Sequence, residues 1–219
     1  MTHHFEQELQ ELKDLLLAMT SRGAAAVGNA IKALVDRDEA LARKVIEDDR
    51  ELDRLEIEID DKSISLLAQA PLARDLRTVT VAMKISHDLE RIGDEATTIA
   101  RRSLDLNQEP QLKPYVDIPR MSELALAMLH EALTAFVTLD AERARQVIPR
   151  DKEVDLLNKQ LQRELASYMV ERPVTISRCL HLMVISKALE RVADHAKNFA
   201  EEVVYLCEAV DIRHPNAPR

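Results

Sequence analysis

Apolar residues recur along most of the chain at intervals of three and four positions, which is the period of one face of an α-helix. The clearest runs are Leu9, Leu12, Leu16 and Met19, then Leu52, Leu55, Ile59 and Leu66, and then Ile85, Leu89, Ile92, Ala96 and Ile99. The pattern therefore predicts an all-α protein.

Prolines divide this helical pattern into segments. Pro110, Pro114 and Pro119 interrupt it between residues 107 and 119, and this segment is a candidate linker near the middle of the chain. Pro71 and Pro173 fall where one periodic stretch stops and the next begins, a position at which proline ends one helix and opens another. The sequence therefore predicts three helices on each side of the linker.

The two halves of the chain are similar to each other. LERIGDEA at 89–96 returns as LERVADHA at 189–196, and between 76–100 and 176–200 nine of 25 positions are identical. Upstream the offset is 102 residues, which pairs Asp49 with Asp151. A duplicated unit of this length predicts two tandem, pseudo-symmetric three-helix bundles. We assign residues 1–106 to the first repeat, 107–119 to the linker, 120–212 to the second repeat and 213–219 to a C-terminal tail.

Two features of the second predicted helix of each repeat can be read from the sequence. Asp38 and Asp140 precede the apolar pattern at matching positions, where an N-cap is expected. Pro149 stands in the second repeat where the first has Glu47. Proline within a helix removes a hydrogen bond and clashes with the preceding turn, so we expect a kink or break there.

Composition and charge narrow the functional classes. The 219 residues are 46% hydrophobic but only 3% aromatic, with three glycines and a net charge of −9. A core built from aliphatic side chains suits packed helices. The acidic balance argues against a direct nucleic-acid partner, which needs clustered Lys and Arg. With so few glycines, the phosphate-cradling loops of nucleotide enzymes are nearly excluded.

Targeting signals are not evident in the sequence. The polar opening MTHHFEQELQELKD lacks the apolar segment of a signal peptide, and no apolar run approaches the roughly 18 residues of a membrane span. Cys179 and Cys207 fall in one predicted helix about 40 Å apart, which is too far for a disulfide. We therefore expect a cytoplasmic protein with two free cysteines.

Pairs of acidic residues at four-residue spacing are the strongest candidates for chemistry. Such spacing places both carboxylates on one helical face, about 6 Å apart, where their repulsion favours a bound cation. Oxygen ligands of this kind suit Mg²⁺, Mn²⁺, Ca²⁺ or iron. In the third helix the apolar seam lies opposite Glu90 and Asp94, so this pair is expected to face outward. The candidate metal ligands are Asp49, Asp53, Glu90 and Asp94 in the first repeat and Asp151, Asp155, Glu190 and Asp194 in the second.

Ordinary surface ion pairs are the alternative to a metal site. The chain has 39 acidic residues, so about seven such pairs arise by chance, and nearby arginines such as Arg50 and Arg91 can neutralise them. Recurrence on the same two helices of both repeats favours metal binding. A carboxylate-metal enzyme, an oxidase or hydrolase, and a metal-free helical scaffold remain open. No histidine completes the Glu-x-x-His pair of di-iron bundles, and His87 and His195 are interpreted as polar surface residues.

These features together resemble the PhoU family. The resemblance rests on two tandem three-helix repeats with paired acidic motifs, on LERIGD and LERVAD, on AxxVI before Asp49, and on DIRH at 211–214. It extends from about Leu9 to His214 and implies one metal cluster per repeat, held by the eight acidic residues given above, with Mg, Mn, Zn or Fe as the ion. Ala193 replaces Gly93, and His195 follows Asp194, so His195 is a candidate nitrogen ligand in the second site only.

The same resemblance implies a function that composition and spacing do not show. A member of this family is expected to be a cytoplasmic regulator of phosphate uptake that restrains the phosphate-starvation response. It would act as a metal-binding adaptor between the ATPase subunit of the phosphate transporter and a membrane sensor histidine kinase, and would reach the membrane only through these partners. The resemblance further implies a homodimer without enzymatic activity.

Overall fold

The computed structural model describes residues 2–69 and 73–213. Within these ranges it contains eight α-helices, two short 3₁₀ helices and no strand, so the prediction of an all-α protein is confirmed. The predicted helix boundary at Pro71 and the tail beyond Arg213, including His214, lie outside the described residues. None of the described helices is long and apolar enough to cross a membrane.

The first repeat contains α1, a broken second helix, and α4. The bounds are α1 (Thr2–Asp36), α2 (Glu39–Asp48), α3 (Arg50–Leu67) and α4 (Ala73–Asn107). Asp38 caps α2, because its Oδ1 accepts a hydrogen bond of 2.9 Å from the backbone N of Leu41. The interruption at Asp49 was not predicted, since no proline or glycine marks it. There the backbone N of Leu52 bonds to the carbonyl of Asp49 at 2.8 Å, a contact of the tighter 3₁₀ type.

The second repeat follows the same plan. Its elements are α5 (Asp117–Thr138), α6 (Ala141–Val147), the 3₁₀ helix η1 (Ile148–Arg150), α7 (Asp151–Glu171), the 3₁₀ helix η2 (Pro173–Thr175) and α8 (Ile176–Glu208). The predicted cap is present, since Oδ1 of Asp140 accepts from the backbone N of Arg143 at 2.9 Å. The predicted break at Pro149 is confirmed, because η1 separates α6 from α7 at this residue.

The connection between the repeats is held at defined points. It leaves α4 after Asn107 and enters α5 at Asp117, so Pro119 lies in the first turn of a helix, where its missing N–H costs nothing. Arg37 donates to the carbonyls of Asn107 and Glu109, each at 2.8 Å. Arg178 of α8 donates to the carbonyl of Pro110 at 2.9 Å. The linker is therefore fastened to both repeats.

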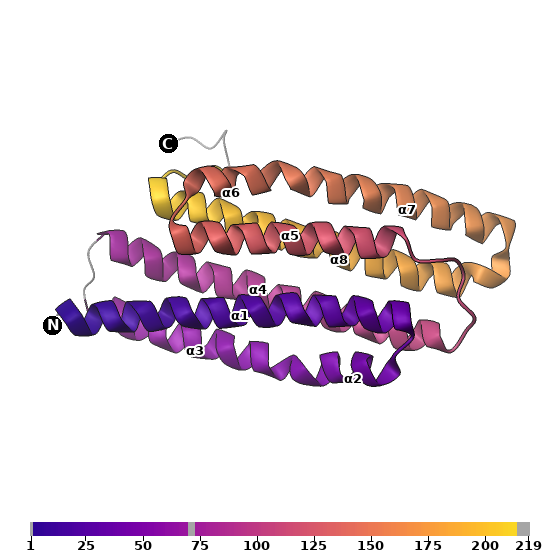
Figure 1. Cartoon of the computed structure of the whole chain (residues 1–219), viewed down its shortest axis with the longest axis horizontal. Helices are drawn as coiled ribbons and strands as arrows, with labels where there is room; N and C mark the ends of the chain where they lie inside the picture. Colours follow the sequence, from indigo (N-terminus) through magenta and orange to yellow (C-terminus); the bar gives the residue numbers. More distant parts are fainter. Residues whose placement is uncertain (1, 70–72, 214–219) are drawn as a thin grey trace.

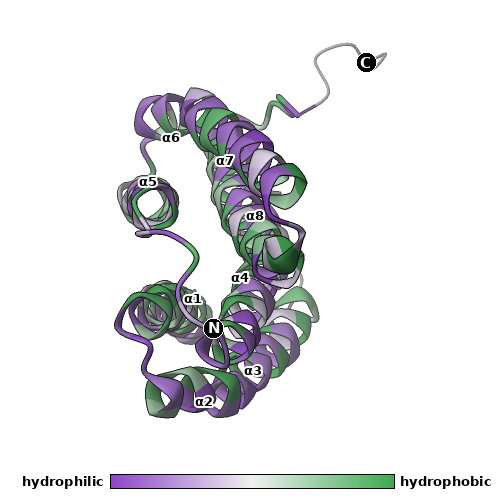
Figure 2. Ribbon diagram, turned by 90° about the vertical axis from the view of Figure 1, so that its right-hand side faces the viewer, coloured by the Kyte–Doolittle hydropathy of each residue, from purple (hydrophilic) through white to green (hydrophobic). Residues whose placement is uncertain are grey.

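The two repeats pack side by side through α4 and α8, which run antiparallel (Figure 1). Viewed along the helices, α1 to α4 form one group and α5 to α8 the other, with α1 next to α5 (Figure 2). Contacts between polar side chains cross the α4–α8 interface. Lys84 lies 3.2 Å from Glu202, His195 lies 2.8 Å from Asp88, and Arg191 lies 3.0 Å from Glu95. This arrangement brings the third helix of each repeat, with its acidic pair, to the centre of the molecule.

The core is aliphatic, as the composition predicts. Leu, Ile, Val, Ala and Met supply nearly all of its buried side chains. The exception is an edge-to-face contact between Phe136 of α5 and Phe199 of α8, with ring centroids 6.0 Å apart. Both cysteines are free, as expected, and Cys179 is buried.

Candidate metal centre

The first repeat places three of its predicted ligands near one another at the junction of α2 and α3, but among the described residues only Glu56, His87 and Glu90 have ligand atoms that all lie within 4.8 Å of one another. Asp49 lies at the interruption, Asp53 follows one turn later on α3, and Asp94 projects from α4. The pKa of Asp49 is raised to about 6, mainly by burial and further by the charges of Asp53 and Asp94, against a smaller opposing effect of Arg101. The three carboxylates therefore repel one another.

Gly93 allows α4 to approach this junction closely. A Cβ atom at this position would lie 2.5 Å from Cδ1 of Leu52 and 3.0 Å from Oδ1 of Asp49. Side-chain atoms cannot share that space without moving. The second repeat has Ala193 at the equivalent position, together with the shorter Val154 in place of Leu52. The absence of a side chain at Gly93 thus sets the position of the Asp49 carboxylate.

If the first repeat holds a metal as the sequence predicts, replacing Gly93 with alanine is expected to weaken its binding by about tenfold, because the added Cβ displaces the Asp49 carboxylate. Thermal stability should change little, since the better helix propensity of alanine, about 1 kcal/mol, offsets the displacement of the flexible Leu52 side chain. Mn²⁺ titration and thermal unfolding of the variant test this. Unchanged affinity would show that the close contact has no role in placing the ligand.

Glu90 forms a second part of the acidic group, with two residues that were not predicted as ligands. Single ligand atoms of Glu56, His87 and Glu90 all lie within 4.8 Å of one another, and Nδ1 of His87 is 3.3 Å from Oε1 of Glu56. Glu56 follows Asp53 by three residues on α3, so the helical spacing alone could have identified it. His87 is a surface residue, as predicted, but it has carboxylate neighbours.

The expected outward orientation holds for only one member of the α4 pair. The side chain of Asp94 is 46% exposed, whereas that of Glu90 is 18% exposed, because α3 with Glu56 lies beside it. Burial raises the pKa of Glu90, and the charge of Asp94 adds to this effect while Arg91 opposes it. The prediction that Glu90 faces outward is therefore wrong.

The donor set of the first repeat fits a divalent cation. Carboxylate oxygens with one imidazole nitrogen suit Mn²⁺, Fe²⁺ or Zn²⁺, and the carboxylates alone suit Mg²⁺. Oε2 of Glu90 is buried and makes no hydrogen bond, although Nε of Arg91 lies 3.3 Å away. Arg91 also pairs with Asp94 at 3.0 Å, but both of its partners belong to α4. Among the described residues, no cationic side chain forms an ion pair with Asp49 or Asp53.

The second repeat brings its acidic residues together around a lysine. Asp151 begins α7 and lies near Asp155 and Asp194. Its pKa is raised, mainly by burial. The charge of Lys197 opposes this effect, and the charges of Asp155 and Asp194 add to it. Nζ of Lys197 lies 3.1 Å from Oδ1 of Asp194 and 3.6 Å from Oδ2 of Asp151. Glu190, the other acidic residue of the predicted pair on α8, forms an ion pair with Lys187.

His195 follows Asp194 in the sequence, but its side chain contacts a carboxylate of the other repeat. Its Nδ1 lies 2.8 Å from Oδ1 of Asp88, which belongs to α4 of the first repeat. The ring also lines an open cavity of about 550 Å³ between the repeats, together with Asp49, Asp94 and Arg191. His195 thus lies at the contact between the repeats.

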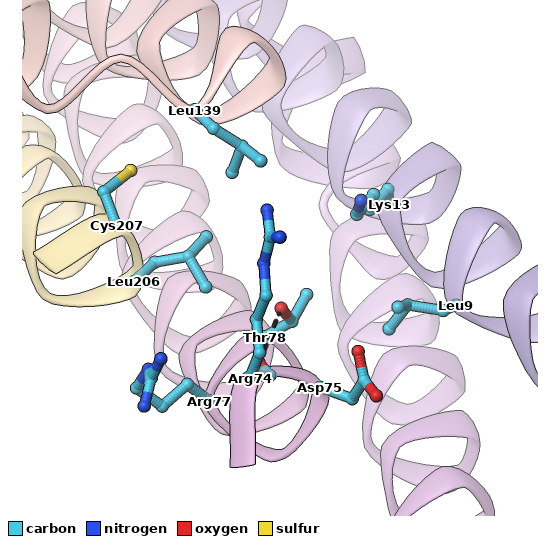
Figure 3. Close-up of a pocket in the computed structure, with 9 residues that line it drawn as sticks. All are labelled: Leu9, Lys13, Arg74, Asp75, Arg77, Thr78, Leu139, Leu206 and Cys207. Atoms are coloured by element: carbon cyan, nitrogen blue, oxygen red, sulfur yellow. Dashed lines mark hydrogen bonds between the residues drawn. The ribbon is translucent and has the colours of Figure 1, made fainter. Parts of the chain in front are cut away.

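A separate cavity of about 540 Å³ lies where α1, α4, α5 and α8 meet (Figure 3). Lys13, Arg74 and Arg77 line it together with Asp75, and the guanidinium of Arg74 points into the open space. The Nε atom of Arg77 is buried without a hydrogen bond. None of the predicted metal ligands lines this cavity. Basic side chains outnumber acidic ones in its lining, unlike in the acidic group of the first repeat.

The fold and the site define the class of protein. It is a duplicated helical-bundle protein in which each repeat presents carboxylates from its second and third helices at one place. The PhoU domain matches residues 16–103 and 118–203, so each repeat is one copy of it. The chain belongs to the PhoU family.

Known proteins resemble the chain over nearly its whole length. It is 40% identical over 220 residues to the phosphate-specific transport system accessory protein PhoU homolog of Pseudomonas aeruginosa, covering 98% of this chain and 91% of that protein. The corresponding homolog of Aquifex aeolicus is 41% identical and is covered to 95%. The crystal structure of PhoU from Pseudomonas aeruginosa superposes with a TM-score of 0.91 over 94% of this chain and all of that one. The phosphate transport system regulatory protein PhoU from Streptococcus pneumoniae gives 0.90 at 30% identity, covering 95% and 99%.

Proposed function

We propose that the protein is an accessory regulator of phosphate transport that restrains the phosphate-starvation response when phosphate is plentiful. The observation that carries this proposal is the match of both repeats to the PhoU domain, with relatives named as accessory proteins of the phosphate-specific transport system covered almost completely. The regulator acts in the cytoplasm as an adaptor between the ATPase subunit of the transporter and a sensor histidine kinase, without catalysis of its own.

Surface features support an adaptor role. Val170 near the end of α7 and Val174 in η2 are 84% and 79% exposed, and this corner lies at the same end of the molecule as the α4–α5 linker (Figure 1). Exposed apolar side chains gathered at one end of a body are typical of a surface that binds another protein. A homodimer or a complex with either partner would cover them.

The first-repeat acidic group is the metal site of this proposal. Asp49, Asp53, Glu90 and Asp94 would hold a divalent cation, with Glu56 and His87 beside Glu90. When bound, the ion neutralises the charge of the site. Because the carboxylates come from both the α2–α3 junction and α4, a bound ion would link these two elements. Metal binding would thus stabilise the face at which a partner contacts both helices.

Deletion of the gene is expected to switch on phosphate-starvation genes in medium rich in phosphate, because the kinase is then no longer restrained. A reporter fused to a starvation promoter measures this, and the wild-type gene supplied in trans should restore repression. In parallel, the tagged protein should retain the transporter ATPase and the kinase in a pull-down from membranes. Normal repression in the deletion strain, with neither partner retained, would refute the proposed function.

A further inference from the structure

The second repeat carries a cation of its own between its two acidic helices. Lys197 extends from α8, and its Nζ bridges Asp194 of the same helix and Asp151 of α7, at 3.1 and 3.6 Å. The side chain is 28% exposed, so the ammonium is partly shielded from water. A contact that joins two helices in this way is the geometry that a bound cation would supply.

The first repeat has no lysine in this register, and Arg101, whose charge acts on Asp49, forms no ion pair with it among the described residues. The residue in register with Lys197 is Thr97, whose hydroxyl donates 2.9 Å to the backbone carbonyl of Asp94. Arg91 neutralises carboxylates of α4 only, and its side chain is 49% exposed, so it is readily displaced. In the part of the chain that the structure describes, Asp49 thus receives no ion pair, whereas Asp151, its counterpart, does.

The same difference appears at the other end of the acidic group. Glu56 and His87 of the first repeat correspond to Asn158 and Lys187 of the second. Asn158 accepts a hydrogen bond of 2.8 Å from Ser186, and Lys187 forms an ion pair with Glu190. The second repeat has therefore exchanged one carboxylate for an amide and one imidazole for an ammonium group, which cannot ligate a metal while it is protonated.

We propose that Lys197 is the built-in counter-ion of the second repeat, so that the chain binds divalent metal through its first repeat only. This proposal rests on the metal site proposed for the first repeat. Lys197 is attached to the chain, so it pairs with Asp151 and Asp194 and offsets part of their negative charge at any metal concentration. The second repeat thus holds its helices together permanently, and only the first repeat responds to the metal.

Electrostatics favour this division. The Nζ atom of Lys197 lies 3.1 Å from Oδ1 of Asp194 and 3.6 Å from Oδ2 of Asp151, so its positive charge occupies the space between these carboxylates. A divalent ion among these carboxylates would lie within a few ångströms of the ammonium. Two like charges at about 4 Å repel by several kcal/mol in a partly buried setting. The second group would have to expel Lys197 before it could bind metal.

Mn²⁺ titration followed by electron paramagnetic resonance tests the proposal, because free and bound Mn²⁺ give different signals. Metal-free full-length protein is compared with Asp49→Asn, Asp151→Asn and Lys197→Thr, the last of which copies the first repeat. We expect Asp49→Asn to lose at least nine tenths of the bound Mn²⁺ and Asp151→Asn to keep the wild-type amount. Lys197→Thr should bind about twice as much as the wild type.

Lys152→Thr is the matched control, because it removes an exposed lysine next to Asp151 that makes no bridge. It should leave Mn²⁺ binding unchanged. Loss of about half of the bound Mn²⁺ in Asp151→Asn, or no gain in Lys197→Thr, would overturn the proposal. If the wild type binds no Mn²⁺, the metal site of the first repeat is refuted. In that case, binding gained in Lys197→Thr would still support the counter-ion role, and absence of binding would refute it.

Discussion

Replacing Phe199 with alanine is expected to lower the free energy of unfolding by about 3 to 5 kcal/mol, the usual cost of truncating a buried aromatic side chain. Phe199 is fully buried and meets Phe136 edge to face, which joins α5 to α8 in the second repeat. The aliphatic neighbours cannot refill a space of this size without leaving a cavity. Chemical denaturation monitored by circular dichroism measures the loss, and the melting temperature should fall by about 10 °C.

Val170→Ala is the control for this substitution, because Val170 is 84% exposed and its truncation should change stability by less than about 0.5 kcal/mol. Equal effects of the two substitutions would show that the Phe136–Phe199 contact does not anchor the second repeat. A second comparison is Ile99→Ala at the equivalent position of the first repeat, also fully buried. It should cost about 2 to 5 kcal/mol, because that repeat packs an aliphatic side chain at the same place.

The fold was predictable because local signals and the repeat agreed. Apolar periodicity gave the helices, and caps at Asp38 and Asp140 gave the start of the second helix in each half. Pro149 predicted one interruption for a local steric reason, but the matching interruption at Asp49 has no such local cause. It coincides with the close approach of Gly93, which depends on how α4 packs. Local helix propensity does not predict packing of this kind.

The acidic group was predictable only in part, because the sequence does not show how neighbouring helices are aligned with one another. Four-residue spacing identified which carboxylates share a face of one helix. Which side chains of neighbouring helices stand opposite them depends on tertiary packing. Lys197 is three residues from Asp194 in sequence, yet its contact with Asp151 of α7 follows only from the packing of α7 against α8. The pairing of His195 with Asp88 across the two repeats has the same origin.

Replacing Thr97 with lysine is expected to weaken Mn²⁺ binding by the first repeat at least about 100-fold, because it installs the counter-ion that the second repeat already has. A factor of 100 corresponds to about 2.7 kcal/mol, less than the several kcal/mol by which two charges about 4 Å apart interact near a protein surface. Thr97 is only 6% exposed, but it lines the open cavity next to Asp49 and Asp94, so we expect the apolar stem of a lysine to extend into this cavity and place the ammonium between the two carboxylates.

Thr97→Met separates charge from size in this experiment, since methionine has a similar length without the ammonium group. We expect the methionine variant to keep Mn²⁺ affinity within about threefold of the wild type, with only the hydroxyl contact to Asp94 lost, a change of about 0.5 to 1 kcal/mol. The lysine variant should also melt at a higher temperature than the methionine variant in the absence of metal, because its ammonium relieves the repulsion among Asp49, Asp53 and Asp94. Added Mn²⁺ should raise the melting temperature of the methionine variant and leave that of the lysine variant unchanged. Equal loss of Mn²⁺ binding in both variants would show that side-chain size at position 97 is the cause. The two repeats would then differ in the room available for a metal and not in charge.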